Sequence, residues 1–323
     1  MSRKTAIIGL GIMGRRMAEH MDRHPGYDIT GSWDPSDDAC AAARDSLPDM
    51  PVADSAEQAM AGADLVYLAC PPAPRKALAM IAADAGQAVF LEKPLGVDIA
   101  ENEALVAHLA ACGVPAAVNF TQAAGAALTN VQKAAQSGQM GELIGADILV
   151  TYPSWPRAWQ VAADWLRFRD EGGMTREVIS HFLFFSERVL GQLTLVSAQP
   201  AYPQDPALCE THMLARLENG QGCPVTIMAS TGGAQPDRQE LTIKGSVESH
   251  RVSEFFIHAS SKGGPFQEIA ERPADPRATS LKAQLDDLLL CLEGKPHRLA
   301  TPEEALRVQK LVEGMLAGTA KTG

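Results

Sequence analysis

The segment that most constrains the fold of this chain lies at residues 7–14 and reads Ile-Ile-Gly-Leu-Gly-Ile-Met-Gly. An apolar run turns here through G-x-G-x-x-G into a stretch with helical spacing. In such a turn the first glycine permits a tight bend, the second lets the backbone approach a pyrophosphate, and the third lets helix pack on strand. The helix N-terminus attracts the negative charge, so the pattern predicts a dinucleotide site, with a purely structural turn as the alternative. The predicted cofactor contacts in this segment are Gly9, Gly11, Ile12, Met13 and Gly14.

Asp34 stands at the end of the second apolar run, roughly 20 residues beyond the glycines, where a carboxylate binds the ribose hydroxyls of NAD. Its charge would also repel the 2′-phosphate of NADP, and the residues after it, Pro-Ser-Asp-Asp, include no arginine to accept that phosphate. NAD is therefore the predicted cofactor and NADP is disfavoured. The alternative is that Asp34 only begins an Asp-Pro turn.

The pattern of apolar runs changes along the chain, and a length of 323 residues favours two domains. Short apolar runs alternate with alanine-rich helical stretches up to residue 121, which predicts a parallel sheet flanked by helices. The later runs are β-branched and separated by Gly, Pro, Asn or Asp, which predicts an antiparallel sheet with helices. The predicted fold is therefore α/β, with a Rossmann domain at 1–121 and an α+β domain at 122–323 that holds a large, mostly antiparallel open sheet. The expected strands are 5–8, 28–33, 64–69, 88–91, 115–119 and 143–151, and the expected helices of the second part are 128–137, 177–190, 280–292 and 302–316.

Composition excludes several classes of partner. The net charge is −11 and no cluster of lysine and arginine is present, which argues against nucleic acid. No apolar stretch reaches the roughly 20 residues of a membrane span. The six cysteines are scattered without any C-x-x-C, so neither a zinc site nor a disulfide framework is expected. We expect a cytoplasmic protein, because the glycine-punctuated apolar run near the start is unlike a signal peptide.

Two known families resemble parts of this sequence. Gly9 to Gly14 with Met17-Ala18 is similar to the opening of the β-hydroxyacid dehydrogenases, but that family has an all-helical second domain, and it is kept as an alternative. The stretch 64–121 resembles the Gfo/Idh/MocA family of glucose-fructose oxidoreductase and inositol dehydrogenase. The markers of this second resemblance are Cys70-Pro71-Pro72, Glu92-Lys93-Pro94, and Gly172-Gly173 leading to His181.

The Gfo/Idh/MocA resemblance implies an NAD-dependent oxidoreductase. Such an enzyme transfers a hydride between nicotinamide and a secondary alcohol or ketone of a sugar, cyclitol or related polyhydroxylated molecule. The resemblance implies Lys93, His181 and Glu177 as catalytic residues. It adds to the cofactor contacts Cys70, Pro71, Glu92 and Lys93.

Alcohol oxidation with NAD requires a group beside the nicotinamide that accepts the hydroxyl proton. Lys93 follows a strand at the ligand-binding edge of a parallel sheet, where partial desolvation lowers the pKa of a lysine. His181 titrates near neutral pH, and Glu177 lies one helical turn earlier, so the two can form a relay. The alternatives are a surface lysine before a turn proline, a structural histidine on an apolar helix, and a carboxylate that stabilises a helix N-terminus. We predict no metal, because a site at Glu177 and His181 would need further ligands.

Departures from the family pattern affect substrate recognition most. Arg75 replaces a common histidine, Phe184 replaces an aspartate, and Gln122-Ala123 replaces two arginines. Phe184 leaves a non-catalytic dinucleotide-binding regulator or sensor as the alternative function. An uncovered sheet face predicts a homodimer or homotetramer. The predicted substrate contacts, for which ordinary packing is the alternative, are Trp165, Arg167 and Thr121.

Overall fold

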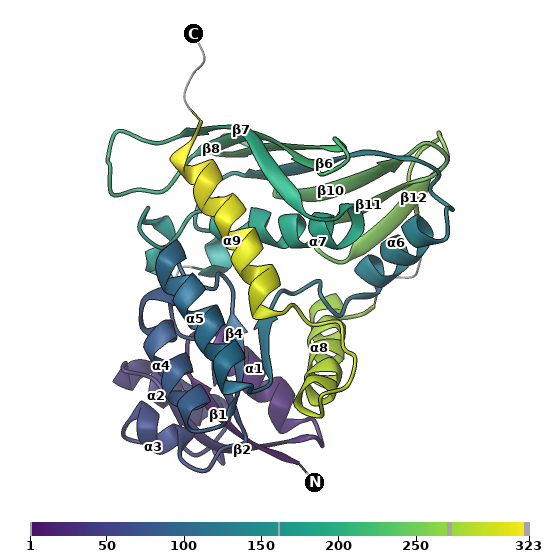
Figure 1. Ribbon diagram of the computed structural model, residues 1–323. Coiled ribbons are helices and arrows are strands. Elements are labelled where there is room, and N and C mark those ends of the chain that lie inside the picture. The colour runs from purple at the N-terminus through teal and green to yellow at the C-terminus, as the bar shows by residue number, and fades with distance from the viewer. Residues whose placement is uncertain (1, 161, 270–272, 320–323) are drawn as a thin grey trace. The chain divides into compact units, whose positions relative to one another are not determined.

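The computed structural model describes residues 2–160, 162–269 and 273–319, which form two compact units (Figure 1). Unit 1 comprises the described residues of Met1–Phe120 together with Leu281–Leu306, and unit 2 those of Thr121–Ser280 and Arg307–Gly323. The sequence pattern placed every residue after 121 in one domain. The structure differs, because the chain returns to unit 1 at Leu281–Leu306.

Unit 1 is built on a parallel sheet of five strands in the order β2-β1-β3-β4-β5, as predicted for a Rossmann fold. The order reverses at β1, which has β2 on one side and β3 on the other, and open α/β sheets bind ligands outside the carboxyl ends of the strands at such a point. The strands are β1 (Arg3–Ile8), β2 (Tyr27–Trp33), β3 (Leu65–Leu68), β4 (Ala88–Glu92) and β5 (Ala116–Asn119). The helices between them are α1 (Ile12–Asp22), α2 (Asp37–Ser46), α3 (Ala56–Met60), α4 (Pro72–Asp84) and α5 (Ile99–Cys112).

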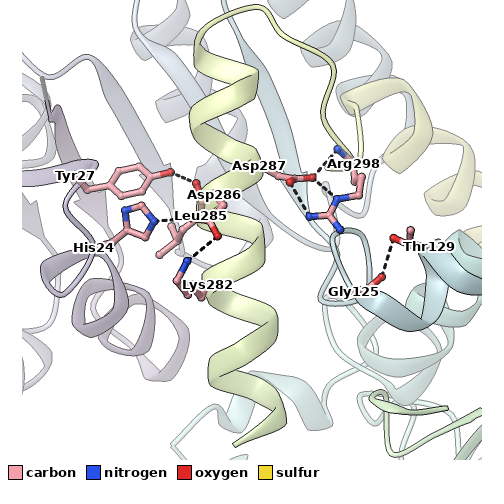
Figure 2. Close-up of polar contacts among 9 residues, drawn as sticks. All are labelled: His24, Tyr27, Gly125, Thr129, Lys282, Leu285, Asp286, Asp287 and Arg298. Carbon is pink, nitrogen blue, oxygen red and sulfur yellow. Dashed lines mark hydrogen bonds and ion pairs between the residues drawn. The ribbon is translucent and has the colours of Figure 1, made fainter. Parts of the chain in front are cut away.

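The segment Leu281–Leu306 joins unit 1 through contacts of helix α8 (Pro276–Leu292) (Figure 2). The Tyr27 hydroxyl donates to the Leu285 carbonyl oxygen at 2.6 Å, and His24 Nε2 lies 2.9 Å from Asp286 Oδ1. Helical periodicity in the sequence predicts the helix but carries no information about the sheet against which it packs.

Unit 2 contains the predicted large sheet, with eight strands in the order β13-β12-β11-β10-β6-β9-β8-β7. All neighbours are antiparallel except the pair β6 and β9. The strands are β6 (Leu143–Tyr152), β7 (Leu193–Ala201), β8 (His212–Asn219), β9 (Pro224–Thr231), β10 (Arg238–Gly245), β11 (Ser249–Ser253), β12 (Ile257–Ser261) and β13 (Gln267–Glu268). The longer helices are α6 (Ala126–Gln136), α7 (Ser180–Leu190) and α9 (Pro302–Ala317).

Burial alternates along the strands of unit 2, which gives the sheet one buried face. In β8, for example, Met213 and Leu217 are buried whereas His212 and Leu214 are exposed. This alternation is the period-two pattern of a sheet with one covered side. Across the described part of the chain, no helix combines the length and the apolar character that crossing a membrane demands.

Candidate functional site

The three fingerprint glycines of unit 1 serve two different purposes. Gly9 has φ +99°, and a Cβ there would lie 2.5 Å from the backbone nitrogen of Cys70. A Cβ on Gly14 would lie 1.8 Å from the carbonyl oxygen of Gly9, so close packing requires both of these glycines. A Cβ on Gly11 would meet no heavy atom within 4 Å. The chain therefore leaves space at Gly11, where the predicted pyrophosphate needs a close approach to the backbone.

Helix α1 presents its N-terminus to the same place. Gly11 is its N-cap residue and has no side chain with which to accept hydrogen bonds from the first amide groups. Ile12 and Met13 lie half-buried in the first turn. Arg15 Nη1 donates to the Leu10 carbonyl oxygen at 2.7 Å, which adds a positive charge beside the glycine loop that the fingerprint does not specify. Amide groups, helix dipole and guanidinium all favour an anion here.

Asp34 connects the ends of β1 and β2. Its Oδ2 accepts from the backbone N–H of Leu10 at 2.7 Å, and its Oδ1 accepts from the backbone N–H of Ser36 at 2.8 Å. The bond from Ser36 forms the Asp-Pro turn that was the alternative role predicted for Asp34. The bond from Leu10 holds the glycine loop in place. Because a carboxylate oxygen can accept from more than one donor, these bonds leave room for the predicted ribose contact.

Lys93 directly follows β4, at the same edge of the sheet as the glycine loop, and is half-buried. The preceding Glu92 is buried and points into the sheet, where its Oε1 accepts from the Tyr67 hydroxyl at 2.5 Å and from Asn119 Nδ2 at 2.6 Å. Burial raises the pKa of the Glu92 carboxyl, while these two donors oppose the shift. Glu92 therefore links β3, β4 and β5 beneath Lys93, and its own predicted cofactor contact stays a prediction.

Arg75 fixes the backbone around Lys93. This arginine of α4 is only 2% exposed, and its Nη1 donates to the carbonyl oxygens of Glu92, at 2.6 Å, and of Pro94. Its Nη2 donates to the Cys70 carbonyl oxygen at 2.5 Å. One guanidinium thus joins the loops that follow β3 and β4. No residue pattern predicts a side chain that binds backbone carbonyls. In the sequence, Arg75 is therefore visible only as a departure from the family pattern.

Cys70 and Pro71, the other predicted cofactor contacts, lie at the end of β3. Cys70 is buried, and desolvation raises the pKa of its thiol. Pro71 is exposed and is the N-cap residue of α4. The backbone of Cys70 lies directly against Gly9, because the Cβ absent from that glycine would collide with it.

The predicted catalytic residues of unit 2 lie at the start of α7. The helix expected to begin at Glu177 instead begins with a π-helical turn (Thr175–Ile179), and such turns are frequent at functional sites. Glu177 Oε1 accepts from Gln160 Nε2 at 3.2 Å. His181 is 4% exposed, and its ring meets the ring of Phe255 edge-to-face at 5.5 Å between centroids. This environment agrees with a structural histidine as well as with a catalytic one.

Buried polar contacts hold this turn in place. Gly173 has φ +102°, and a Cβ there would lie 2.4 Å from Glu210 Oε2. Glu210 Oε1 accepts from the backbone N–H of Thr175 at 2.7 Å. Arg176 forms a two-pronged ion pair with Glu313 of α9, each bond 2.7 Å long. The Gly-Gly pair is therefore required by the packing of the loop that leads to His181.

Aromatic side chains at the end of β6 and in the loop that follows it surround the guanidinium of Arg157. The Arg157 guanidinium carbon lies 4.7 Å from the ring centroid of Trp159, and 5.3 Å and 5.8 Å from those of Tyr152 and Trp155. Arg157 Nη2 is also 3.9 Å from Glu177 Oε1. Such cation–π contacts order a loop that has no regular period of its own.

The three predicted substrate contacts of unit 2 are spread along the chain. Trp165 is half-buried, whereas Arg167 is exposed and pairs with Asp164 at 3.3 Å. The carbonyl oxygen of Thr121 accepts from the Ser280 hydroxyl at 2.7 Å. Their contact with a substrate stays a prediction, as does a role for His181 in the same reaction as Lys93, which lies in unit 1.

Comparison with known proteins adds an independent result. Residues 3–120 match the family model Gfo/Idh/MocA, described as an oxidoreductase family with an NAD-binding Rossmann fold. A search of curated protein sequences finds no match.

Several solved structures share the fold over nearly the whole chain. GenD2 from gentamicin A biosynthesis, solved with NAD, has a TM-score of 0.81 and 18% identity over 97% of this chain and 93% of its own. UDP-N-acetylglucosamine 3-dehydrogenase GnnA from Acidithiobacillus ferrooxidans has a TM-score of 0.80 and 17% identity over 98% and 97%. The WlbA dehydrogenase from Bordetella pertussis, solved with NADH and UDP-GlcNAcA, has a TM-score of 0.80 and 22% identity over 97% and 95%.

Proposed function

Residues 3–120 of this chain match the Gfo/Idh/MocA oxidoreductases and their NAD-binding Rossmann fold, and on that premise we propose the reaction that the chain catalyses. The chain transfers a hydride between nicotinamide and a secondary alcohol or ketone of a sugar, cyclitol or related polyhydroxylated small molecule. The observation that carries the proposal is the position of Lys93. It is a half-buried lysine at the edge of the sheet that bears the glycine loop, with the backbone on both of its sides fixed by Arg75.

The residues of unit 1 fit NAD. The open space at Gly11, the N-terminus of α1 and the nearby Arg15 suit the pyrophosphate, and Asp34 suits the ribose. Bound NAD supplies the site that accepts or gives up the hydride. The negative charge of Asp34 favours NAD over NADP, which a titration of the chain with both cofactors measures directly.

Lys93 and His181 are proposed to handle the proton that accompanies hydride transfer. An ammonium group at Lys93 donates to the reacting oxygen when a ketone is reduced, and a neutral amine accepts the hydroxyl proton when an alcohol is oxidised. His181 is proposed as the second group that takes up this proton. Glu177 is proposed to assist His181, although in the structure its Oε1 is engaged by Gln160.

The substrate class rests on unit 2 and on similar proteins. Two similar structures are named for UDP-linked sugars, a 3-dehydrogenase of UDP-N-acetylglucosamine and a dehydrogenase solved with UDP-GlcNAcA. Trp159 is exposed, and an aromatic ring suits the C–H surfaces of sugars, although Arg157 already lies over its ring; Arg167 is exposed as well. We propose that Trp165 and Arg167 contact the substrate.

A panel of sugars, cyclitols and nucleotide sugars, each incubated with the chain and NAD or NADH, tests the proposal. We expect nicotinamide absorbance to change with at least one of them, and no change with simple β-hydroxy acids. Binding of NAD with no turnover on the whole panel would favour the regulator alternative. That alternative has one supporting observation, because Phe184, which replaces a family carboxylate, is only 1% exposed with Arg188 over its ring.

We also propose that a second copy covers the exposed face of the sheet in unit 2. Leu214 and Met228 are register partners in β8 and β9, and both are about half exposed, at 51% and 54%. Adjacent exposed apolar side chains of this kind mark association surfaces. Analytical ultracentrifugation should give a dimer or tetramer, and Met228→Lys should shift it toward the monomer.

A further inference from the structure

Three groups capable of binding a metal ion meet on the surface of unit 1. They are Asp84, the last residue of α4, together with His108 and Cys112 of α5, and their ligand atoms all lie within 4.8 Å of one another. Helix α4 runs from the end of β3 to the start of β4, so its last residue lies at the opposite edge of the sheet from the glycine loop and Lys93. The cluster is therefore separate from the proposed active site.

The spacing of the three atoms is close to that of zinc ligands. His108 Nε2 is 2.8 Å from Asp84 Oδ1 and 3.5 Å from Cys112 Sγ, and this sulfur is 3.8 Å from Asp84 Oδ1. Around a tetrahedral zinc ion with bonds of about 2.0–2.3 Å, ligand atoms lie about 3.3–3.6 Å apart. Two of the three separations are close to this, and the third requires the exposed Asp84 carboxylate to move by roughly 0.5 Å.

The same geometry argues against a nucleophilic triad. A catalytic histidine uses one ring nitrogen for the nucleophile and the other for the carboxylate. Here Asp84 and Cys112 both approach Nε2 of His108, and the thiol also approaches the carboxylate. Three atoms that converge on one another in this way suit a shared cation better than a relay.

We propose that Asp84, His108 and Cys112 form a surface site for a divalent transition-metal ion of the zinc class, with water in the remaining position. Sulfur, imidazole and carboxylate are the ligand types that zinc takes in proteins. Thiolate and carboxylate together balance the two positive charges. Asp84 and Cys112 are also the last residues of their helices, where the helix dipole favours a cation. Binding would join α4 to α5 and release the thiol proton.

Titration of the reduced, untagged full-length chain with Co²⁺ tests the site. We expect one equivalent to bind, with a near-ultraviolet absorption band from thiolate-to-cobalt charge transfer. Cys112→Ser should abolish the band, and Asp84→Asn should weaken binding by roughly 10-fold or more. Cys223→Ser is the matched control, because this half-buried cysteine belongs to unit 2 and is not one of the three proposed ligands, so its replacement should leave the band unchanged.

Thermal unfolding gives a second readout. An ion that binds only the folded state raises the melting temperature, so Zn²⁺ should stabilise the parent and the Cys223→Ser variant but not Cys112→Ser. Because Cys112 is exposed, its replacement by serine should leave folding intact. A charge-transfer band that persists in Cys112→Ser, or a parent chain that binds no Co²⁺, would overturn the proposal. Neither result would bear on NAD binding or turnover.

Discussion

Arg75 holds Lys93 from both sides, because one of its nitrogens donates to the carbonyl oxygen of the residue before the lysine and to that of the residue after it. The same guanidinium reaches the Cys70 carbonyl oxygen at the end of β3. A planar group with several donors in a rigid fork can make these contacts together, whereas an ammonium group cannot reproduce them all. The position of Lys93 therefore depends on a residue that never needs to touch substrate.

Arg75→Met should lower turnover by roughly 10- to 100-fold, because small displacements of a catalytic group cost about this much. NAD affinity should change less, since the glycine loop is intact. Arg75→Lys keeps the charge and should recover only part of the loss. Turnover equal to the parent's in either folded variant would show that Lys93 does not depend on this support.

Lys93→Met keeps the length of the side chain and removes the ammonium group. If Lys93 handles the proton, turnover should fall by roughly 10²- to 10⁴-fold while NAD affinity and melting temperature change little. Lys76→Met is the matched control, because this half-buried lysine of α4 pairs with the exposed Glu101 at 3.5 Å and is not among the predicted site residues. Activity of Lys93→Met within a few-fold of the control would remove Lys93 from the chemistry.

Gly11→Val should abolish NAD binding without unfolding the chain. A Cβ at this position meets no heavy atom within 4 Å, so the expected loss of stability is only about 1 kcal/mol, from a less favourable N-cap residue. Gly14→Ala should instead prevent folding, because its Cβ would collide with the Gly9 carbonyl oxygen. Calorimetric titration with NAD, alongside circular dichroism, separates the two effects. Retained NAD binding in Gly11→Val would mean that the cofactor does not approach this loop.

His181→Asn should lower turnover and flatten its dependence on pH between about 6 and 8 if this residue carries the proton. His212→Asn, at an exposed position on β8, serves as the control. A pH profile identical to the parent's would leave His181 as a structural contact of Phe255. Proton handling would then be assigned to Lys93 alone.

The contribution of His258 to the unfolding free energy should decrease as the pH falls from about 6.5 to about 4, because this residue is held neutral in the fold. Burial and the nearby His250 lower the pKa of His258 from 6.5 to about 4, while Glu248 opposes the shift. His250 Nδ1 lies 2.9 Å from His258 Nε2, and Lys262 Nζ lies 3.7 Å from Glu248 Oε2. Over this range His258 binds more protons in the unfolded chain than in the folded chain, so at this residue acid favours unfolding.

His258→Gln should reduce this loss by on the order of 1–2 kcal/mol, since water at the sheet edge screens part of the effect. Urea unfolding at a series of pH values measures it, with His212→Gln as the control. If the slope of unfolding free energy against pH is unchanged in His258→Gln, the assignment of this pH dependence to His258 is wrong. Some slope should remain, because burial also lowers the pKa of His250.

The parts of the fold that depend on local patterns were predictable from the sequence. Buried strands such as Leu65–Leu68 appear as apolar runs between breakers, and the glycine fingerprint places the turn after β1. The antiparallel sheet of unit 2 follows from alternation and turn residues. These features are encoded within a few residues of one another.

The parts that were not predictable depend on residues distant in sequence. Arg75 binds carbonyl oxygens up to 19 residues away, and such acceptors are independent of side-chain identity. The return of Leu281–Leu306 to unit 1 depends on where Tyr27 and His24 lie. Thr175–Ile179 winds as a π-helical turn although its apolar spacing suits an ordinary helix. The pairing of Asp84 with His108 likewise requires two helices to be placed side by side.

The two kinds of glycine in the loop after β1 bear on how such a fingerprint should be interpreted in other chains. Close backbone packing requires Gly9 and Gly14, so a related protein that no longer bound the cofactor would still need both glycines in order to fold. Among the three glycines, Gly11 is not required by the packing of the protein. Larger residues would replace it once no cofactor approached the loop. A fingerprint that keeps only its outer glycines therefore indicates descent from a dinucleotide-binding protein, and the middle glycine indicates that a dinucleotide is still bound.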